Sequence, residues 1–167
     1  MSYQEHKRLS LDHVKCAVIT TSDSRTEIDD ESGKYIKQRL TEAGHTVTYY
    51  TILKNSAEII GSEITRLVEH SDAQVILTSG GTGLSRKDVT VNTARRLLEK
   101  ELEGFGELFR QLSYQEIGTG AMMSRALAGV ANAKVIICVP GSLGAVKLAM
   151  DKIILPEIGH LVREATR

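Results

Sequence analysis

The segment 77–90, LTSGGTGLSRKDVT, combines three glycines with hydroxyl side chains, two basic residues and one acid. Glycine lets backbone N–H groups approach an anion closely, and a helix that starts near Val89 or Thr90 adds unpaired N–H donors and the positive end of its dipole. Arg86 and Lys87 add cationic donors. A phosphate-binding loop needs these properties, but a flexible turn uses the same residue types.

The spacing in this segment differs from two well-known phosphate-binding motifs. GxxxxGK[ST] fails because Ser85 stands five residues after Gly80 and Asp88 five residues after Gly83, and GxGxxG fails at Arg86. Asp88 would repel a phosphate unless its carboxylate caps the following helix or binds a divalent metal. The segment alone leaves both roles open.

Strand and helix patterns alternate along most of the chain. Apolar runs typical of buried strands lie at 14–21, 45–53 and 73–78, and a hairpin is predicted at 126–139 with its turn at 131–133. Amphipathic helices are expected at 31–43, 60–68, 94–102 and 105–112, and in a C-terminal segment that is interrupted at Pro156.

This order predicts an α/β fold, a three-layer α/β/α sandwich around a mostly parallel, mixed sheet. Ligands of such sheets bind outside the carboxyl ends of the strands. Three polar loops follow strands here, at 22–25 (SDSR), 79–83 (SGGTG) and 140–142 (PGS). If their strands are parallel neighbours, the three loops build one cleft.

Length and charge narrow the class of protein. The 167 residues suit one domain, over 14–167, preceded by a polar extension at 1–13. The 21 basic and 21 acidic residues balance, so no global field attracts nucleic acid or a membrane, and the absence of a signal or membrane-spanning run predicts a cytoplasmic protein. Cys16 and Cys138 are expected in the core, and the five histidines form no metal-binding motif.

Five segments, in order, resemble the molybdenum cofactor biosynthesis protein B and molybdopterin adenylyltransferase family (MoaB/MogA), and the resemblance covers about 14–164. They are TTSDSRT at 20–26, DESG at 30–33, TSGGTGLSRKDVT at 78–90, the EGFGE-to-AGV segment within 103–135, and VPGSLGAVKLAMDKIILPEIGH at 139–160. The resemblance implies the same three-layer fold. For catalytic members it also implies transfer of AMP from ATP to the terminal phosphate of molybdopterin, with Mg²⁺ and release of pyrophosphate.

The resemblance also implies the site. Asp88 would be the catalytic and metal-orienting acid, and Gly80, Gly81, Thr82 and Gly83 would line the pocket for molybdopterin and ATP. Further binding residues carried over from the family motifs are Ser22, Asp23, Ser24, Arg25, Asp30, Gly33, Ser79, Ser124, Arg125, Pro140, Gly141 and Ser142. Family members form trimers or hexamers, for which the surfaces around Phe105, Phe109 and the C-terminal helix are candidates, and other proteins of cofactor biosynthesis are possible partners.

Some of these residues also have purely structural interpretations. Asp30 is equally suited to capping the helix that follows it, Arg125 to pairing with a surface acid, and Pro140 with Gly141 to ending a strand. The apolar surfaces offered for assembly are equally compatible with core packing.

The acids of the family pattern are incomplete in this chain. Asn55 and Ser56 stand where the family carries an Asp pair, and Asn92 stands where its DVTPEA motif has Glu. Neutral oxygens accept hydrogen bonds but bind a divalent ion less strongly. Two functions therefore remain open, an adenylyltransferase and a non-catalytic protein that binds molybdopterin and nucleotide. A third interpretation, that the loops serve only protein contacts, has no specific motif behind it.

Overall fold

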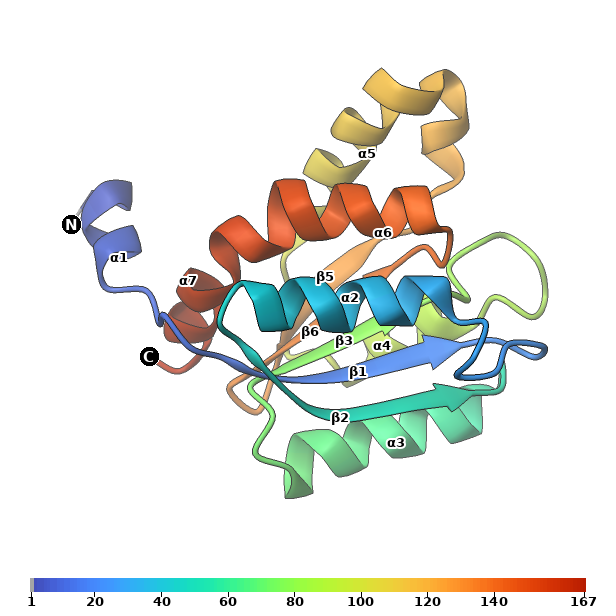
Figure 1. Cartoon of the computed structure of the whole chain (residues 1–167), viewed down its shortest axis with the longest axis horizontal. Helices are drawn as coiled ribbons and strands as arrows, with labels where there is room; N and C mark the ends of the chain where they lie inside the picture. Colours follow the sequence, from blue (N-terminus) through green and yellow to red (C-terminus); the bar gives the residue numbers. More distant parts are fainter. Residues whose placement is uncertain (1) are drawn as a thin grey trace.

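A single six-stranded sheet organises the molecule, which a computed structural model describes over residues 2–167 (Figure 1). The strands follow the order β2-β1-β3-β6-β5-β4 across the sheet. Their bounds are β1 Lys15–Thr21, β2 Thr46–Leu53, β3 Val75–Ser79, β4 Lys100–Glu101, β5 Leu127–Ala131 and β6 Lys134–Val139. Strands β2, β1, β3 and β6 are parallel, whereas β5 runs antiparallel to both of its neighbours, so the sheet is mixed, as predicted.

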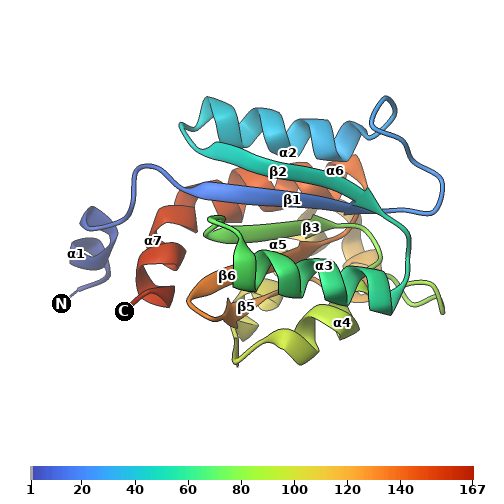
Figure 2. The same cartoon turned by 90° about the horizontal axis from the view of Figure 1, so that it is seen from below.

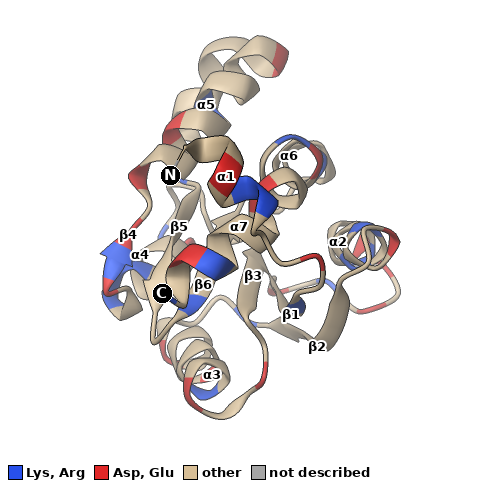
Figure 3. Cartoon of the chain, turned by 90° about the vertical axis from the view of Figure 1, so that its left-hand side faces the viewer, with Lys and Arg blue, Asp and Glu red and all other residues tan. Residues whose placement is uncertain are grey.

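Helices cover both faces of this sheet. The helices are α1 Tyr3–Arg8, α2 Glu31–Glu42, α3 Ala57–His70, α4 Thr90–Leu97, α5 Glu103–Ile117, α6 Leu143–Ala149 and α7 Leu155–Ala165. One buried cluster joins the sheet to α2, α5, α6 and α7, and a second joins the opposite face to α3 and α4 (Figures 2 and 3). The predicted three-layer α/β/α sandwich is therefore confirmed.

The burial of the elements follows their residue patterns. Strand β3 is buried along its whole length, as expected for a central parallel strand covered on both faces. In α3 the predicted stripe of Ile60, Ile64, Leu67 and Val68 is the buried face. None of the helices between Ser2 and Arg167 is long and apolar enough to cross a membrane.

The hairpin prediction is confirmed, but the helix predicted at 94–102 is wrong in its extent. Strands β5 and β6 pair through a turn at Asn132 and Ala133, whose φ angles are 47° and 59°. Helix α4 ends at Leu97, and the next residues pair with β5 as the short edge strand β4. Backbone hydrogen bonds from Glu99 N to Val130 O (2.8 Å) and from Leu102 N to Ala128 O (2.7 Å) frame this strand, so strand pairing overrides the helical spacing of the leucines.

Two expectations about the helices are also corrected. Helix α6, a π-helical turn at Met150–Ile154 and α7 follow one another directly, so Pro156 does not interrupt the C-terminal segment. The wider π turn lies where a regular helix would clash with the proline ring and lack a donor. Phe105 and Phe109 are buried in the core, so they offer no surface for assembly.

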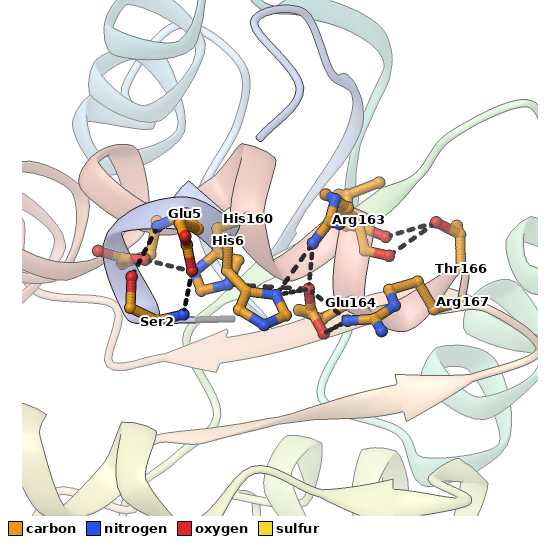
Figure 4. Close-up of polar contacts among 10 residues, drawn as sticks. Ser2, Glu5, His6, His160, Arg163, Glu164, Thr166 and Arg167 are labelled. Atoms are coloured by element: carbon orange, nitrogen blue, oxygen red, sulfur yellow. Dashed lines mark hydrogen bonds and ion pairs between the residues drawn. The ribbon is translucent and has the colours of Figure 1, made fainter. Parts of the chain in front are cut away.

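Polar contacts hold α1, which has no buried residue, against α7 at the edge of the molecule (Figure 4). Glu157 Oε1 accepts from Tyr3 Oη (2.5 Å) and Lys7 Nζ (2.7 Å), and Glu164 Oε1 lies 3.1 Å from His6 Nδ1. His6, Glu164 and His160 are the one group of three metal-ligand side chains found together in the described chain.

A guanidinium, however, already lies among these ligand atoms. Arg163 Nη1 is 2.6 Å from Glu164 Oε1 and 3.2 Å from His6 Nδ1. Because arginine stays protonated, its charge opposes a second cation at this place. We therefore interpret the cluster as a polar contact between α1 and α7.

Protonation of Glu157 is expected to weaken the contact between α1 and α7. Burial raises the pKa of Glu157, but hydrogen bonds from Lys7, Tyr3 and His160 outweigh it and lower the pKa to about 2. The unfolded chain has a higher carboxyl pKa, so the stabilisation is complete above about pH 5 and is lost as the pH falls toward 2. In urea unfolding from pH 6 to 2.5, the stability difference between the wild type and Glu157→Gln should shrink as the pH falls.

The exposed Glu116 on α5 offers a matched control. Glu116→Gln should change stability little, and any small difference should not follow the same pH course. A Glu157→Gln difference that is constant from pH 6 to 2.5 would contradict the role given to this carboxylate.

Candidate functional site

A pocket of about 580 Å³ opens at the carboxyl ends of β1, β3 and β6. These three strands are parallel neighbours, and their ends are level because Thr20 is paired with Ser79 and Ser79 with Val139. The three polar loops that follow them meet there, as the sequence predicted. The pocket is lined by Thr21, Ser22, Asp23, Ser24, Arg25, Asn55, Ser79, Gly80, Gly81, Thr82, Gly83, Asp88, Met123, Ser124, Pro140 and Gly141.

The glycines after β3 bring the backbone of this loop against β1 and α4. Gly80 has φ +98°, and a Cβ on it would lie 2.4 Å from Thr21 O. Gly81 has φ +64°, and a Cβ on it would lie 2.2 Å from Thr90 Oγ1. Both positions therefore need glycine, for conformation and for space.

The loop leaves several backbone donors unpaired. Within residues 2–167, the N–H groups of Gly81, Thr82 and Gly83 donate no hydrogen bond, whereas Gly80 N donates to Val139 O at 3.0 Å. Consecutive unpaired N–H groups in a turn form a concavity that binds anions. The lining can therefore bind a phosphate group through its backbone.

Arg125 holds this loop from the side of its carbonyl groups. Its Nε donates to Thr82 O (3.1 Å) and Gly83 O (3.0 Å), and its Nη2 donates to Asp88 O (3.0 Å). In a trans peptide the C=O and the next N–H point in opposite directions, so the Gly83 N–H is turned away from Arg125. The remaining donor, Nη1, binds Asn92 Oδ1 at 2.6 Å. Arg125 thus braces the loop and does not pair with a surface acid.

Asp88 closes the turn at the far end of the loop. Its Oδ2 accepts from Ser85 N (2.9 Å) and Ser85 Oγ (2.7 Å). The cap residue of α4 is Val89, with no side-chain hydrogen bond, so Asp88 does not cap this helix. Its other oxygen, Oδ1, accepts no hydrogen bond from the described residues, and Asp88 lines the pocket. The carboxylate is therefore free to bind a further group.

Asp23 and Asn55 form a second polar wall. Asp23 Oδ1 accepts from Asn55 N (3.0 Å), and Lys87 Nζ lies 3.8 Å from Asp23 Oδ2. The pKa of Asp23 is lowered by hydrogen bonds from Asn55, and the nearby charges of Lys87 and Lys54 act in the same direction. Asn55 Oδ1 is buried and has no partner in the chain after Met1, which leaves an unpaired acceptor in the lining.

Asp30 and Gly33 lie behind the pocket and do not line it. Asp30 is fully buried, caps α2 by accepting from Gly33 N (3.0 Å), and accepts from Thr20 Oγ1 and Tyr50 Oη, both at 2.6 Å. Burial raises the pKa of Asp30, but these hydrogen bonds and the Arg25 charge lower it overall. A Cβ on Gly33 would lie 2.1 Å from Asp30 Oδ2. The helix-capping interpretation therefore holds for this pair.

The loop after β6 is hydrogen-bonded to the loop after β1. Gly141 O accepts from Arg25 Nη1 (3.3 Å) and Ser32 Oγ (2.8 Å), so these two loops are fixed relative to each other. Pro140 and Gly141 line the pocket, but Ser142 caps α6 by accepting from Ala145 N at 3.3 Å. Ser142 is thus placed as a structural residue.

Comparisons with known proteins agree with this arrangement. A family model described as a probable molybdopterin binding domain matches residues 17–160. The molybdenum cofactor biosynthesis protein B of Bacillus anthracis is 48% identical over 168 residues, covering 100% of this chain and 99% of that protein. The protein of the same name from Bacillus subtilis is 47% identical over 165 residues, with 98% and 97% covered. The chain belongs to the molybdenum cofactor biosynthesis protein B family.

Solved structures of this family share the fold. A crystal structure of a molybdenum cofactor biosynthesis protein B is 49% identical, with a TM-score of 0.89 over 92% of this chain and 96% of that one. The tungsten cofactor synthesizing protein MoaB from Pyrococcus furiosus is 35% identical, with a TM-score of 0.82 over 95% and 100%.

The family motifs found most, but not all, of the pocket. Asp30, Gly33, Arg125 and Ser142 lie outside the lining, whereas the other residues carried over from the family motifs lie in it. Thr21 and Met123 line the pocket without having been predicted, and Asn55 was noted only as a departure. Met123 directly precedes Ser124 and Arg125, which the family motifs did predict, and this position was the sequence signal that could have found it.

Replacement of Gly81 is the sharpest test of the loop. Gly81→Ala should destabilise the protein by about 2 kcal/mol, because alanine is strained at this φ and its Cβ meets Thr90. It should also weaken phosphate binding, measured by titration with tripolyphosphate. Gly104→Ala, within α5 and open on all sides, is the matched control and should preserve both properties. Equal behaviour of the two variants would rule out the tight backbone contact.

Proposed function

We propose that this chain acts in molybdenum cofactor biosynthesis by transferring AMP from ATP to the terminal phosphate of molybdopterin. The observation that carries the proposal is the loop Gly81–Gly83, which lines the pocket at the carboxyl ends of three strands and whose N–H groups donate no hydrogen bond within residues 2–167. Both proposed substrates carry phosphate groups. The match to a probable molybdopterin binding domain is the reason for proposing molybdopterin as one of them. The proposed products are adenylyl-molybdopterin and pyrophosphate.

The reaction asks the protein chiefly to position two polyanions. An oxygen of the molybdopterin phosphate attacks the α-phosphorus of ATP, a new P–O bond forms, and the bond to the bridging oxygen of pyrophosphate breaks. Negative charge moves toward the leaving pyrophosphate, so fixed N–H donors and cationic side chains lower the barrier. The loop amides, together with Arg25 and Lys87, are the donors that this chain offers at the pocket.

The oxygen donors of the pocket are compatible with Mg²⁺. This ion is usually held by one or two carboxylates together with substrate phosphates and water. Asp88 supplies a carboxylate with one oxygen not engaged within the described chain, and Asn55 Oδ1 supplies a buried neutral acceptor. We propose Asp88 as the principal ligand. The ion would offset the charge that develops on the phosphates.

Three neutral residues favour a second candidate, a non-catalytic protein that binds molybdopterin and nucleotide. Asn55 and Ser56 replace the Asp pair of the family pattern, and Ser56 serves as the cap of α3 by accepting from Ile59 N at 3.3 Å. Asn92 accepts a hydrogen bond from Arg125, so the guanidinium is paired with a neutral amide where the family pattern has a carboxylate. Binding of the polyanions needs few carboxylates, whereas metal-assisted transfer needs more.

Pyrophosphate release from molybdopterin, ATP and Mg²⁺ distinguishes the two candidates. The wild type should release pyrophosphate, and Asp88→Asn should lower the rate by about 100-fold or more while ATP still binds. Asp72→Asn is the matched control, because Asp72 pairs with Lys15 at the opposite end of the strands. Binding of both substrates without any release by the wild type would exclude the transferase.

The second arm of the same assay restores the missing acids. Aspartate caps helices as well as serine, so Asn55→Asp with Ser56→Asp should preserve α3 and raise the rate or the Mg²⁺ affinity. A double variant that gains nothing would show that these positions do not limit the reaction.

We also propose that the chain self-associates through α5, which projects from the body of the molecule (Figures 1 and 3). Tyr114 and Ile117, three residues apart and so on the same face of this helix, are 59% and 61% exposed. Such a grouping of large apolar side chains is typical of a subunit contact. Light scattering should give a multiple of the 18.3 kDa chain mass, reduced by Ile117→Glu but not by Glu116→Lys beside it. A monomer at all concentrations would contradict the proposal.

A further inference from the structure

The pocket lining has few apolar side chains, yet each proposed substrate carries a heterocycle with a planar ring besides its phosphates. Glycines, hydroxyls, Asn55 and charged side chains make up the lining, and Met123 and Pro140 are its only two apolar side chains among the described residues. The loop amides would bind the phosphates. A planar ring is held mainly by apolar contact, so it has few places to bind in this pocket.

Met123 is placed in the pocket by a fixed backbone. It ends a 3-10 helix at Gly118–Met123, in which Ala121 is buried and accepts from Ser124 N at 3.1 Å. Two residues later Arg125 is anchored to the carbonyls of the glycine loop. The backbone at Met123 is therefore held from both sides, next to the loop that would bind the phosphates.

The side chain of Met123, in contrast, is 53% exposed. Methionine has three rotatable bonds and a polarisable sulfur that interacts favourably with aromatic rings, so it adapts to a ring more readily than a branched side chain does. Closing over a ring would also remove apolar surface of Met123 from water. A fixed backbone with an exposed, flexible side chain is the arrangement expected of a ring contact.

We propose that Met123, together with Pro140, forms the subsite for the planar heterocycle of the substrate, the adenine of ATP or the pterin of molybdopterin. The inference rests on the proposed function, because it takes the two substrates from there. It divides the pocket into two subsites: the glycine loop binds the phosphates, and Met123 with Pro140 binds the ring.

The test compares ligands with and without a ring. Met123→Ala should weaken binding of ATP, of molybdopterin, or of both by about tenfold, and the ligand that loses affinity identifies the ring. Binding of tripolyphosphate, which has no ring, should stay within twofold of the wild type. Met123→Leu, which keeps most of the apolar surface, should restore most of the lost affinity.

The neighbouring methionine supplies the matched control. Met122 is 78% exposed and does not line the pocket, so Met122→Ala should bind all three ligands as the wild type does. Light scattering of each variant checks that its assembly is unchanged. Unaltered ATP and molybdopterin binding by Met123→Ala would overturn the subsite, as would an equal loss for tripolyphosphate. A wild type that binds tripolyphosphate but neither ring-bearing ligand would overturn the proposed function as well.

Discussion

The close packing of the Gly80–Gly81 backbone against Thr21 is the constraint on which the site depends. No Cβ fits on either glycine, because Thr21 O and Thr90 Oγ1 lie within 2.4 Å of where it would be. This contact exists only because β1 and β3 are adjacent, parallel and level at their ends. The sheet topology therefore determines the loop conformation, and the loop conformation leaves the amides of Gly81–Gly83 without partners among residues 2–167.

The chain as a whole is neutral, so the charges that act on a ligand at this loop are those of the nearby side chains. Arg125 donates hydrogen bonds to the loop carbonyls, while Asp88 and Asp23 accept hydrogen bonds from neighbouring residues. Asn55 and Asn92 keep the hydrogen-bonding capacity of the family's acids but not their charge. Compared with a pocket that has those acids, this one is less negative, which favours polyanion binding and weakens metal binding. We propose that Asn55, Ser56 and Asn92 together shift the chain between a transferase and a binding protein.

The parts of the fold that were predictable are those with a strong local pattern. The buried strands, the α3 stripe and the glycine loop each follow from residue spacing, and the convergence of three loops follows from parallel strands. The short strand β4 was missed because the leucines that flank it, at 97, 98 and 102, also fit a helix, and only the pairing with β5 decides between helix and strand. Asp30 and Ser142 act as helix caps, and their side chains lie outside the pocket lining. The spacing of residues in the sequence does not reveal on which side of the pocket wall a side chain lies. Met123 was missed because an exposed methionine at the end of a short 3-10 helix carries no periodic signal.

Hydrogen–deuterium exchange of the glycine loop tests the central claim most directly. Amides without hydrogen bonds exchange quickly, so the peptide covering 80–84 should exchange fast in the free protein and slow down when ATP binds. The strands and α1 should change little. If ATP binds, as measured independently by equilibrium dialysis, while exchange at 80–84 stays as fast as before, the glycine loop is not the phosphate site.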